Sequence, residues 1–146
     1  MREQLKKVTI RKSVRQKIKD QIPLVLNSAL DWMGDKYPNV DFRKADFIFS
    51  SGYCRSRYFR NGGERRPTVC ISTRVTLMLY DMKSLGIKNN SMFVGSGVQM
   101  TAALIHELTH HVQYENGLNK GELLTTSNEL EYLKDNHNKY YEEIIK

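Results

Sequence analysis

The residues best suited to chemistry lie in one pentapeptide, His106-Glu107-Leu108-Thr109-His110. Histidines four positions apart lie on one face of an α-helix, with Cβ atoms about 5–6 Å apart, so both imidazoles can bind the same metal ion. The glutamate beside the first histidine can reach a water molecule at that ion without being a ligand, which suits a general base. The pattern predicts metal-assisted hydrolysis with one Zn²⁺ per chain.

The flanking sequence predicts that this motif lies in a helix over Gly97–Glu115. Ser96 and Gln99 have the spacing of a capping box, which starts a helix, and Gly117 suits the position just beyond a helix end. Apolar residues recur at helical spacing and form a stripe that faces the core: Val98, Ala102, Ile105, Leu108 and Val112. The two histidines, Gln113 and Tyr114 then lie on a different face of the helix.

A catalytic zinc takes three protein ligands and keeps one position open, so a third ligand must follow His110. If a second, antiparallel helix begins near Gly121, a rise of 1.5 Å per residue places His110 about 9 Å and His106 about 15 Å from the turn. Glu129 then lies about 12 Å along the second helix, level with the space between the histidines. Glu129 is the predicted third ligand, and Glu122 is the alternative if the connecting loop is longer.

Peptide hydrolysis also needs a hydrogen-bond donor for the oxyanion. A last helix is predicted from about Glu122 or Ser127 to the C-terminus, and it offers three candidates for oxyanion or substrate contact: Tyr132, His137 and Tyr140. The histidine among them also suits a partly buried structural position. The sequence does not choose between these side chains.

The rest of the chain predicts an α+β fold. Apolar residues at helical spacing indicate an N-terminal helix over about Val14–Met33, begun by a capping box at Ser13 and kinked at Pro23. A further short helix is expected at Val75–Leu85. We expect a minimal, zincin-like domain with this N-terminal helix, a small and mostly antiparallel sheet of three to four strands, the histidine-bearing helix and a closing C-terminal helix.

The sheet is predicted from runs rich in β-branched and aromatic residues. Three of them form an antiparallel meander, and Asn61-Gly62-Gly63 is a strong turn signal inside it. A short edge strand is also expected near the N-terminus. The predicted strands are Lys7–Ile10, Ala45–Ser51, Tyr53–Arg60 and Pro67–Thr73.

The chain is basic, with a formal net charge of +7. Part of the excess lies in the hairpin, at Arg55, Arg57, Arg60, Arg65 and Arg66. These arginines are either charged edges that prevent strand aggregation or a basic surface for a substrate or a nucleic-acid partner. The sequence carries no signature of a nucleic-acid-binding module.

Length and composition bound the class of protein. The 146 residues, 40% of them hydrophobic, suit a single globular domain over 1–146, in which 1–12 can form a flexible basic arm. Cys54 and Cys70 are expected to be reduced structural thiols. The sequence contains no transmembrane run, so we expect a cytoplasmic protein with no membrane partner.

The motif resembles the gluzincin type of zinc metallopeptidase, in which Glu129, preceded by Asn128, stands at the position of the third ligand. The resemblance implies Zn²⁺ held by His106, His110 and Glu129, Glu107 as general base, and a protein or peptide substrate. The order of elements is also similar to compact SprT-like and phage-encoded metallopeptidase domains, which implies host cytoplasm as the location if the chain is phage-encoded.

Two features depart from these families. SprT-like proteins usually supply a third histidine, and none stands at a matching place. The acidic residue expected four positions after the glutamate ligand is Leu133 here, so support for a histidine must come from elsewhere. Three other classes of function remain: a zinc-binding protein that does not hydrolyse, a protease brought to DNA by its basic surface, and a metal-free interaction protein.

Overall fold

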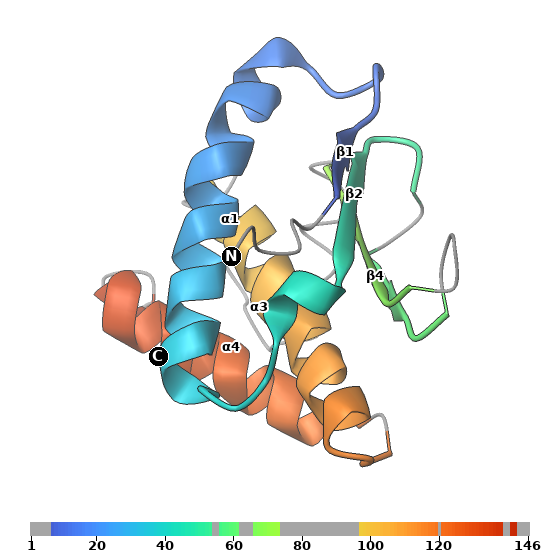
Figure 1. Ribbon diagram of the computed structural model, residues 1–146. Helices are drawn as coiled ribbons and strands as arrows, with labels where there is room; N and C mark the ends of the chain where they lie inside the picture. Colours follow the sequence, from blue (N-terminus) through green and yellow to red (C-terminus); the bar gives the residue numbers. More distant parts are fainter. Residues whose placement is uncertain are drawn as a thin grey trace, which may run out of the picture.

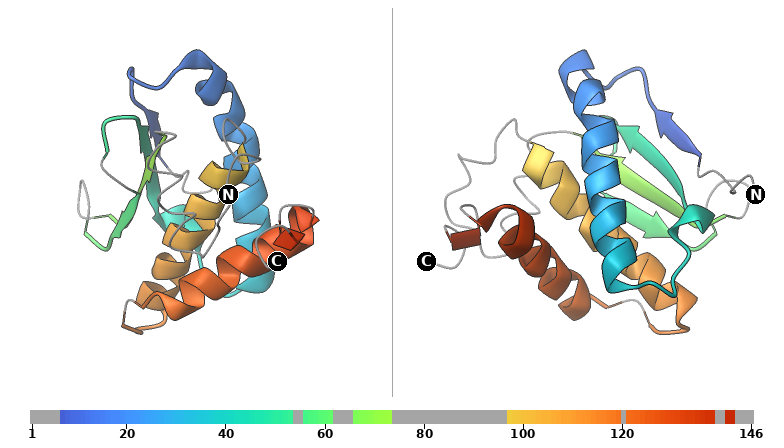
Figure 2. Two further views of the ribbon diagram at one scale, coloured as in Figure 1. Left: turned by 180° about the vertical axis from the view of Figure 1, so that it is seen from behind. Right: turned by 60° about the vertical axis from the view of Figure 1, so that its left-hand side comes forward.

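The computed structural model describes residues 7–53, 56–61, 66–73, 97–119, 121–138 and 141–142. Within this part of the chain the fold is α+β, as expected, with three helices on one side of a four-stranded sheet (Figure 1). The strand order is β1-β2-β4-β3. Two further views show the same layering, with α3 between the sheet and α4 (Figure 2).

The first half of the chain is a β–α–β unit. β1 (Val8–Ile10) is followed by α1 (Gln16–Lys36) and then by β2 (Asp46–Ser50), which pairs with β1 in parallel. A parallel pair needs a crossover connection, and α1 is that crossover. The predicted N-terminal edge strand is confirmed, and 7–12 are therefore part of the fold and not a free arm.

The second half of the sheet is a hairpin whose inner strand pairs with β2. β3 (Arg57–Phe59) and β4 (Thr68–Ser72) are antiparallel, and β4 lies between β3 and β2, parallel to β2. The predicted strands are present, but the antiparallel meander is wrong because β4, not β3, is the neighbour of β2. Two of the three strand pairs are parallel.

The helix-facing side of the sheet is apolar. Phe47 pairs in register with Val69, and Phe49 with Ile71. All four side chains are fully buried. Alternate residues of a strand point to the same face, so these two register pairs form one surface against which α1 and α3 pack.

α1 differs from its prediction at both ends. Arg15 is its N-cap and makes no side-chain capping bond, so the predicted capping box at Ser13 does not form. The helix continues through Pro23 and Gly34 to Lys36. A single-turn 3-10 helix, η1 (Phe42–Lys44), then leads into β2.

α3 (Gly97–Glu115) has the bounds expected from the sequence. Gly117 has a φ of 69°, which glycine adopts without strain. The amide of Gly117 donates to the carbonyl of Tyr114, and that of Leu118 donates to the carbonyl of Gln113 at 2.8 Å. This pattern is a Schellman motif, and it turns the chain sharply toward α4.

α4 (Leu123–Asn136) crosses α3 (Figure 1) and ends before the C-terminus, with His137 as its C-cap. The predicted last helix is therefore interrupted at His137, and helical residues recur at 138 and 141–142. Buried Asn128 fixes where α4 lies, because its Nδ2 donates to Thr109 Oγ1 of α3 at 3.0 Å and to Tyr37 Oη beyond α1 at 2.9 Å. Asn128 thus links α4 to α3 and to the C-terminal end of α1.

Several predictions fall outside the described residues: the Val75–Leu85 helix, the start of the cap at Ser96, Cys54, Arg55, Arg65 and Tyr140. Cys70 is a free and buried thiol, as expected, and burial raises its pKa. None of the described helices is both long and apolar enough to span a lipid bilayer.

Candidate metal centre

The side chains of the three motif residues come close together on α3. One possible ligand atom from each of His106, Glu107 and His110 lies within 4.8 Å of the others. His110 and Glu107 are buried, and His106 is partly exposed. The arrangement follows from the helix, because residues three and four apart share a face.

The Nε2 atoms of the two histidines point toward one carboxylate. Glu122 Oε1 lies 2.8 Å from His106 Nε2, and Glu122 Oε2 lies 3.3 Å from His110 Nε2. Glu122 is the N-cap of α4, and its side chain is 67% exposed. The two nitrogens and this carboxylate therefore define a locus at the protein surface that solvent can reach.

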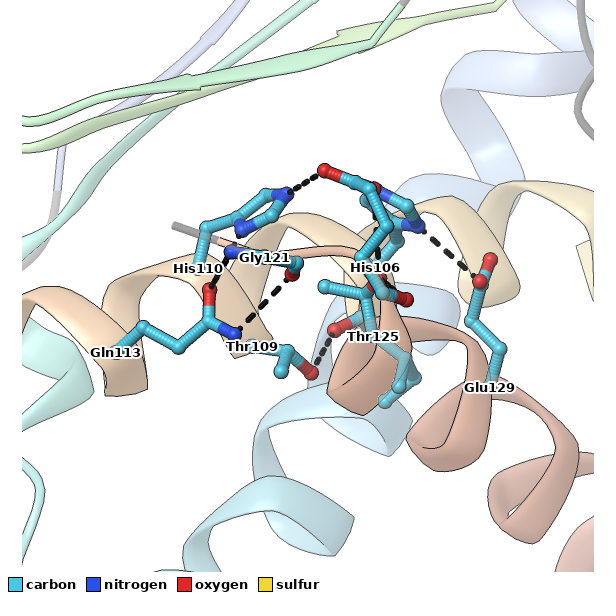
Figure 3. A network of polar contacts seen from close by, with 9 residues as sticks. His106, Thr109, His110, Gln113, Gly121, Thr125 and Glu129 are labelled. Atoms are coloured by element: carbon cyan, nitrogen blue, oxygen red, sulfur yellow. Dashed lines mark hydrogen bonds and ion pairs between the residues drawn. The ribbon is translucent and has the colours of Figure 1, made fainter. Parts of the chain in front are cut away.

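The Nδ1 atoms are held by two other side chains (Figure 3). Glu129 Oε2 of α4 lies 3.1 Å from His106 Nδ1, and Gln113 Oε1 lies 2.8 Å from His110 Nδ1. A carboxylate can only accept a hydrogen bond, so His106 carries its proton on Nδ1. Side chains that hold the second ring nitrogen are a regular feature of metal-binding histidines.

Glu129 was predicted to lie level with the space between the two histidines. Its carboxylate contacts one of them, at Nδ1 of His106 and not at Nε2. Glu122, the alternative ligand for a longer loop, is the carboxylate that reaches both Nε2 atoms. α4 begins at Leu123, two residues later than assumed. Glu122 consequently belongs to the loop, which brings it back over α3.

The carboxylates near His106 change its pKa. Burial lowers this pKa, whereas three nearby carboxylates raise it, with the hydrogen-bonded Glu129 first, and the net pKa is about 9. In the metal-free protein both ring nitrogens of His106 are therefore protonated at neutral pH. A cation at Nε2 would take the place of one of these protons.

His111, the third consecutive polar residue, does not join the site. Its side chain is fully buried. The Tyr58 hydroxyl donates to His111 Nδ1 at 2.8 Å, and His111 Nε2 donates to the carbonyl of Asp41 at 3.1 Å. Both ring nitrogens thus form hydrogen bonds inside the core, because successive residues of a helix point about 100° apart and His111 therefore faces away from His110.

Tyr132, one of the predicted oxyanion donors, points its hydroxyl toward α1. Tyr132 is only 1% exposed, and its hydroxyl lies 2.5 Å from that of Ser28 in α1. A side chain so buried cannot touch a substrate, so this role is wrong for Tyr132. The ring of His137 packs against Tyr132, with ring centroids 5.8 Å apart.

The described hairpin arginines differ in their contacts. Arg57 on β3 is exposed. Arg60 donates to the carbonyl of Leu118 at 3.3 Å and lies over the ring of Tyr114. Arg66 pairs with the Asp46 carboxylate at 3.1 Å. Arg60 and Arg66 therefore have structural partners, which favours the interpretation of the hairpin charges as part of the fold.

Sequence reasoning placed Gln113 on the polar face of α3 but gave it no role. The signal was present, because Gln113 is three residues after His110 and therefore lies beside it on the helix. Comparison with protein-family models, with curated proteins and with solved structures finds no match to this chain. The function therefore has to be inferred from the geometry of the site.

Proposed function

We propose that this protein is a metal-dependent peptide hydrolase whose metal ion, zinc by preference, is bound by the Nε2 atoms of His106 and His110. The observation that carries the proposal is the convergence of these two nitrogens on a single carboxylate, Glu122, at 2.8 Å and 3.3 Å. Two imidazoles and one carboxylate are a regular ligand set for catalytic zinc.

The donor set fits a cation in three ways. The Nε2 atoms of both rings face the same locus, and the Nδ1 atoms are occupied by Glu129 and Gln113. The Glu122 carboxylate supplies an oxygen on the same side. Glu129 acts as the acceptor that orients His106, so its role differs from that of a ligand predicted from the sequence.

A bound zinc ion would polarise a peptide carbonyl and lower the pKa of a water molecule toward neutrality. Glu107 is the general base: it takes a proton from the attacking water and passes it to the leaving amine nitrogen. Its position supports this role, because its carboxylate lies within 4.8 Å of the ligand atoms of both histidines. Exposed Glu122 leaves the locus open to an extended peptide.

The test compares wild type with Glu107→Gln, loaded with one equivalent of zinc, on a library of unstructured peptides. Glu107→Gln should retain zinc, because Glu107 is not a ligand, and should lose hydrolysis by at least about 100-fold, the range of general-base catalysis. An amide matches the carboxylate in shape but cannot accept a proton at neutral pH.

Two results would reject the proposal. Hydrolysis by Glu107→Gln at the wild-type rate would exclude Glu107 as the base. Zinc-loaded wild-type protein that cleaves no peptide in the library would favour a zinc-binding protein that does not hydrolyse.

A further inference from the structure

The loop between α3 and α4 is joined to the metal-binding face by one side chain, Gln113. Gln113 Nε2 donates to the carbonyl of Gly121 at 3.1 Å, and the Gly121 amide donates to Gln113 Oε1 at 3.3 Å. The same Oε1 lies 2.8 Å from His110 Nδ1. One amide group therefore contacts both a metal-binding ring and the residue just before Glu122 (Figure 3).

These contacts fix the orientation of the Gln113 amide. A backbone N–H can only donate and a backbone carbonyl can only accept, so the two bonds to Gly121 place Oε1, and not the NH₂ group, beside His110. An oxygen there can only accept, and His110 must carry its proton on Nδ1. The other ring nitrogen, Nε2, faces Glu122 and is the atom that a cation would bind.

Two other contacts hold this loop. Thr125 Oγ1 of α4 donates to the carbonyl of Glu122 at 2.6 Å. Arg60, which directly follows β3, donates to the carbonyl of Leu118 at 3.3 Å. Glu122 itself is 67% exposed, so burial does little to hold its side chain in place. Gln113, in contrast to Glu122, is buried, with only 5% of its surface exposed. A fixed, buried amide thus positions a loop that carries an exposed carboxylate.

We propose that Gln113 is a positioning residue that couples the two halves of the metal site: it sets the tautomer of His110 and latches the loop that presents Glu122. The part of this inference that concerns metal binding rests on the proposed function. The latch and the tautomer are properties of the metal-free protein and can be measured without metal.

Three variants separate the two tasks. Gln113→Met keeps the length of the side chain and removes both hydrogen-bonding groups. Gln113→Glu restores an acceptor for His110 Nδ1 but cannot donate to Gly121. Arg60→Met releases the loop at Leu118 and leaves the His110 contact intact. Gln16→Ala, at an exposed glutamine of α1, is the control for loss of a glutamine, and circular dichroism checks that each variant is folded.

The first readout is made on metal-free protein, from the ¹⁵N chemical shifts of the His110 ring and the hydrogen exchange of the Gly121 amide. Gln113→Met should mix the two tautomers and speed exchange at Gly121. Gln113→Glu should restore the Nδ1–H tautomer, and Arg60→Met should leave it unchanged. Unchanged ring shifts and exchange in folded Gln113→Met would overturn the inference, whether or not the protein hydrolyses peptides.

The second readout is zinc affinity in a double-mutant cycle with Glu122→Gln. Gln113→Met should weaken zinc binding by about 10–100-fold, the usual effect of losing a side chain that orients a ligand. In the Glu122→Gln background the same change should cost several-fold less, because the loop then has no carboxylate to present. Equal losses in both backgrounds would show that Gln113 and Glu122 act independently, which contradicts the coupling.

Discussion

His110 and His111 are adjacent in α3 and are both buried, at 3% and 0% exposed, yet their contacts suit them to different tasks. Both ring nitrogens of His111 form hydrogen bonds inside the core, Nδ1 with the Tyr58 hydroxyl and Nε2 with the carbonyl of Asp41. In His110, Nδ1 forms a hydrogen bond with Gln113 of the same helix, and Nε2 faces the exposed Glu122. Burial alone does not distinguish His111 from His110, the proposed metal ligand, whereas the partners of their ring nitrogens do.

The most severe test of this difference is His110→Ala. It removes one of two nitrogen donors, so zinc affinity should fall by more than the about 100-fold seen when only an orienting residue is lost. Isothermal titration calorimetry at fixed pH and ionic strength measures the change. Wild-type zinc affinity in the folded variant would mean that the metal does not bind at this locus.

The matching substitution at the neighbouring histidine, His111→Ala, should lower the stability of the fold. It leaves a cavity and deprives the Tyr58 hydroxyl and the Asp41 carbonyl of their partner, which together should lower the free energy of unfolding by about 3 kcal/mol. Urea denaturation of metal-free protein measures this loss. A loss of zinc affinity as large as that of His110→Ala would contradict the division of tasks.

A smaller effect is expected from Glu129→Gln. The amide can still accept from His106 Nδ1, so zinc affinity should fall by about tenfold, and Glu122→Gln should cost more because Glu122 faces both Nε2 atoms. Glu131→Gln, on the exposed side of α4, is a matched control. If Glu129→Gln costs more than Glu122→Gln, the ligand predicted from the sequence is the correct one.

The smallest effect concerns pH. Burial lowers the pKa of His111 from its usual 6.5, so at acidic pH the unfolded chain binds a proton that the folded chain does not. The stability from neutral His111 is complete above pH 6.5 and is lost as the pH falls from there through the folded pKa.

Denaturation of metal-free wild type and His111→Gln between pH 7 and pH 5 measures this dependence. The variant cannot titrate at this position, so its stability should change less with pH. His106 adds a pH dependence of its own, because its pKa rises from 6.5 to about 9 on folding, but this contribution is present in both proteins and cancels in the comparison. Equal pH dependence in both proteins would show that His111 does not stay neutral on folding.

Features that depend on nearby residues were predictable. The bounds of α3 and the glycine beyond its end follow from a stripe at helical spacing and from the φ that Gly117 must adopt. The residues of β2 and β4 also follow from local composition. The i, i+4 spacing of His106 and His110 was sufficient to bring their rings together.

Features that depend on residues distant in the sequence were not predictable. Whether β2 pairs with β3 or β4 is decided by packing against α1 and α3, which no local pattern encodes. Which ring nitrogens Glu122 and Glu129 contact depends on where α4 begins and on the contacts of Gln113 with the loop. The start of α4 differs by two residues from the predicted one. Burial of Tyr132 depends on Ser28, which is far away in the sequence.

The candidate site lies within the contiguous segment 106–129, whereas the sheet joins β1 to β2 across the whole of α1. Closing a short loop costs less chain entropy than closing a long one, and local contacts form faster than distant ones. During refolding, the helix pair that holds the metal donors should therefore assemble before the parallel strands are in register. Zinc added to the unfolded chain would then bind an early intermediate, and the order of folding events would depend on when the metal arrives.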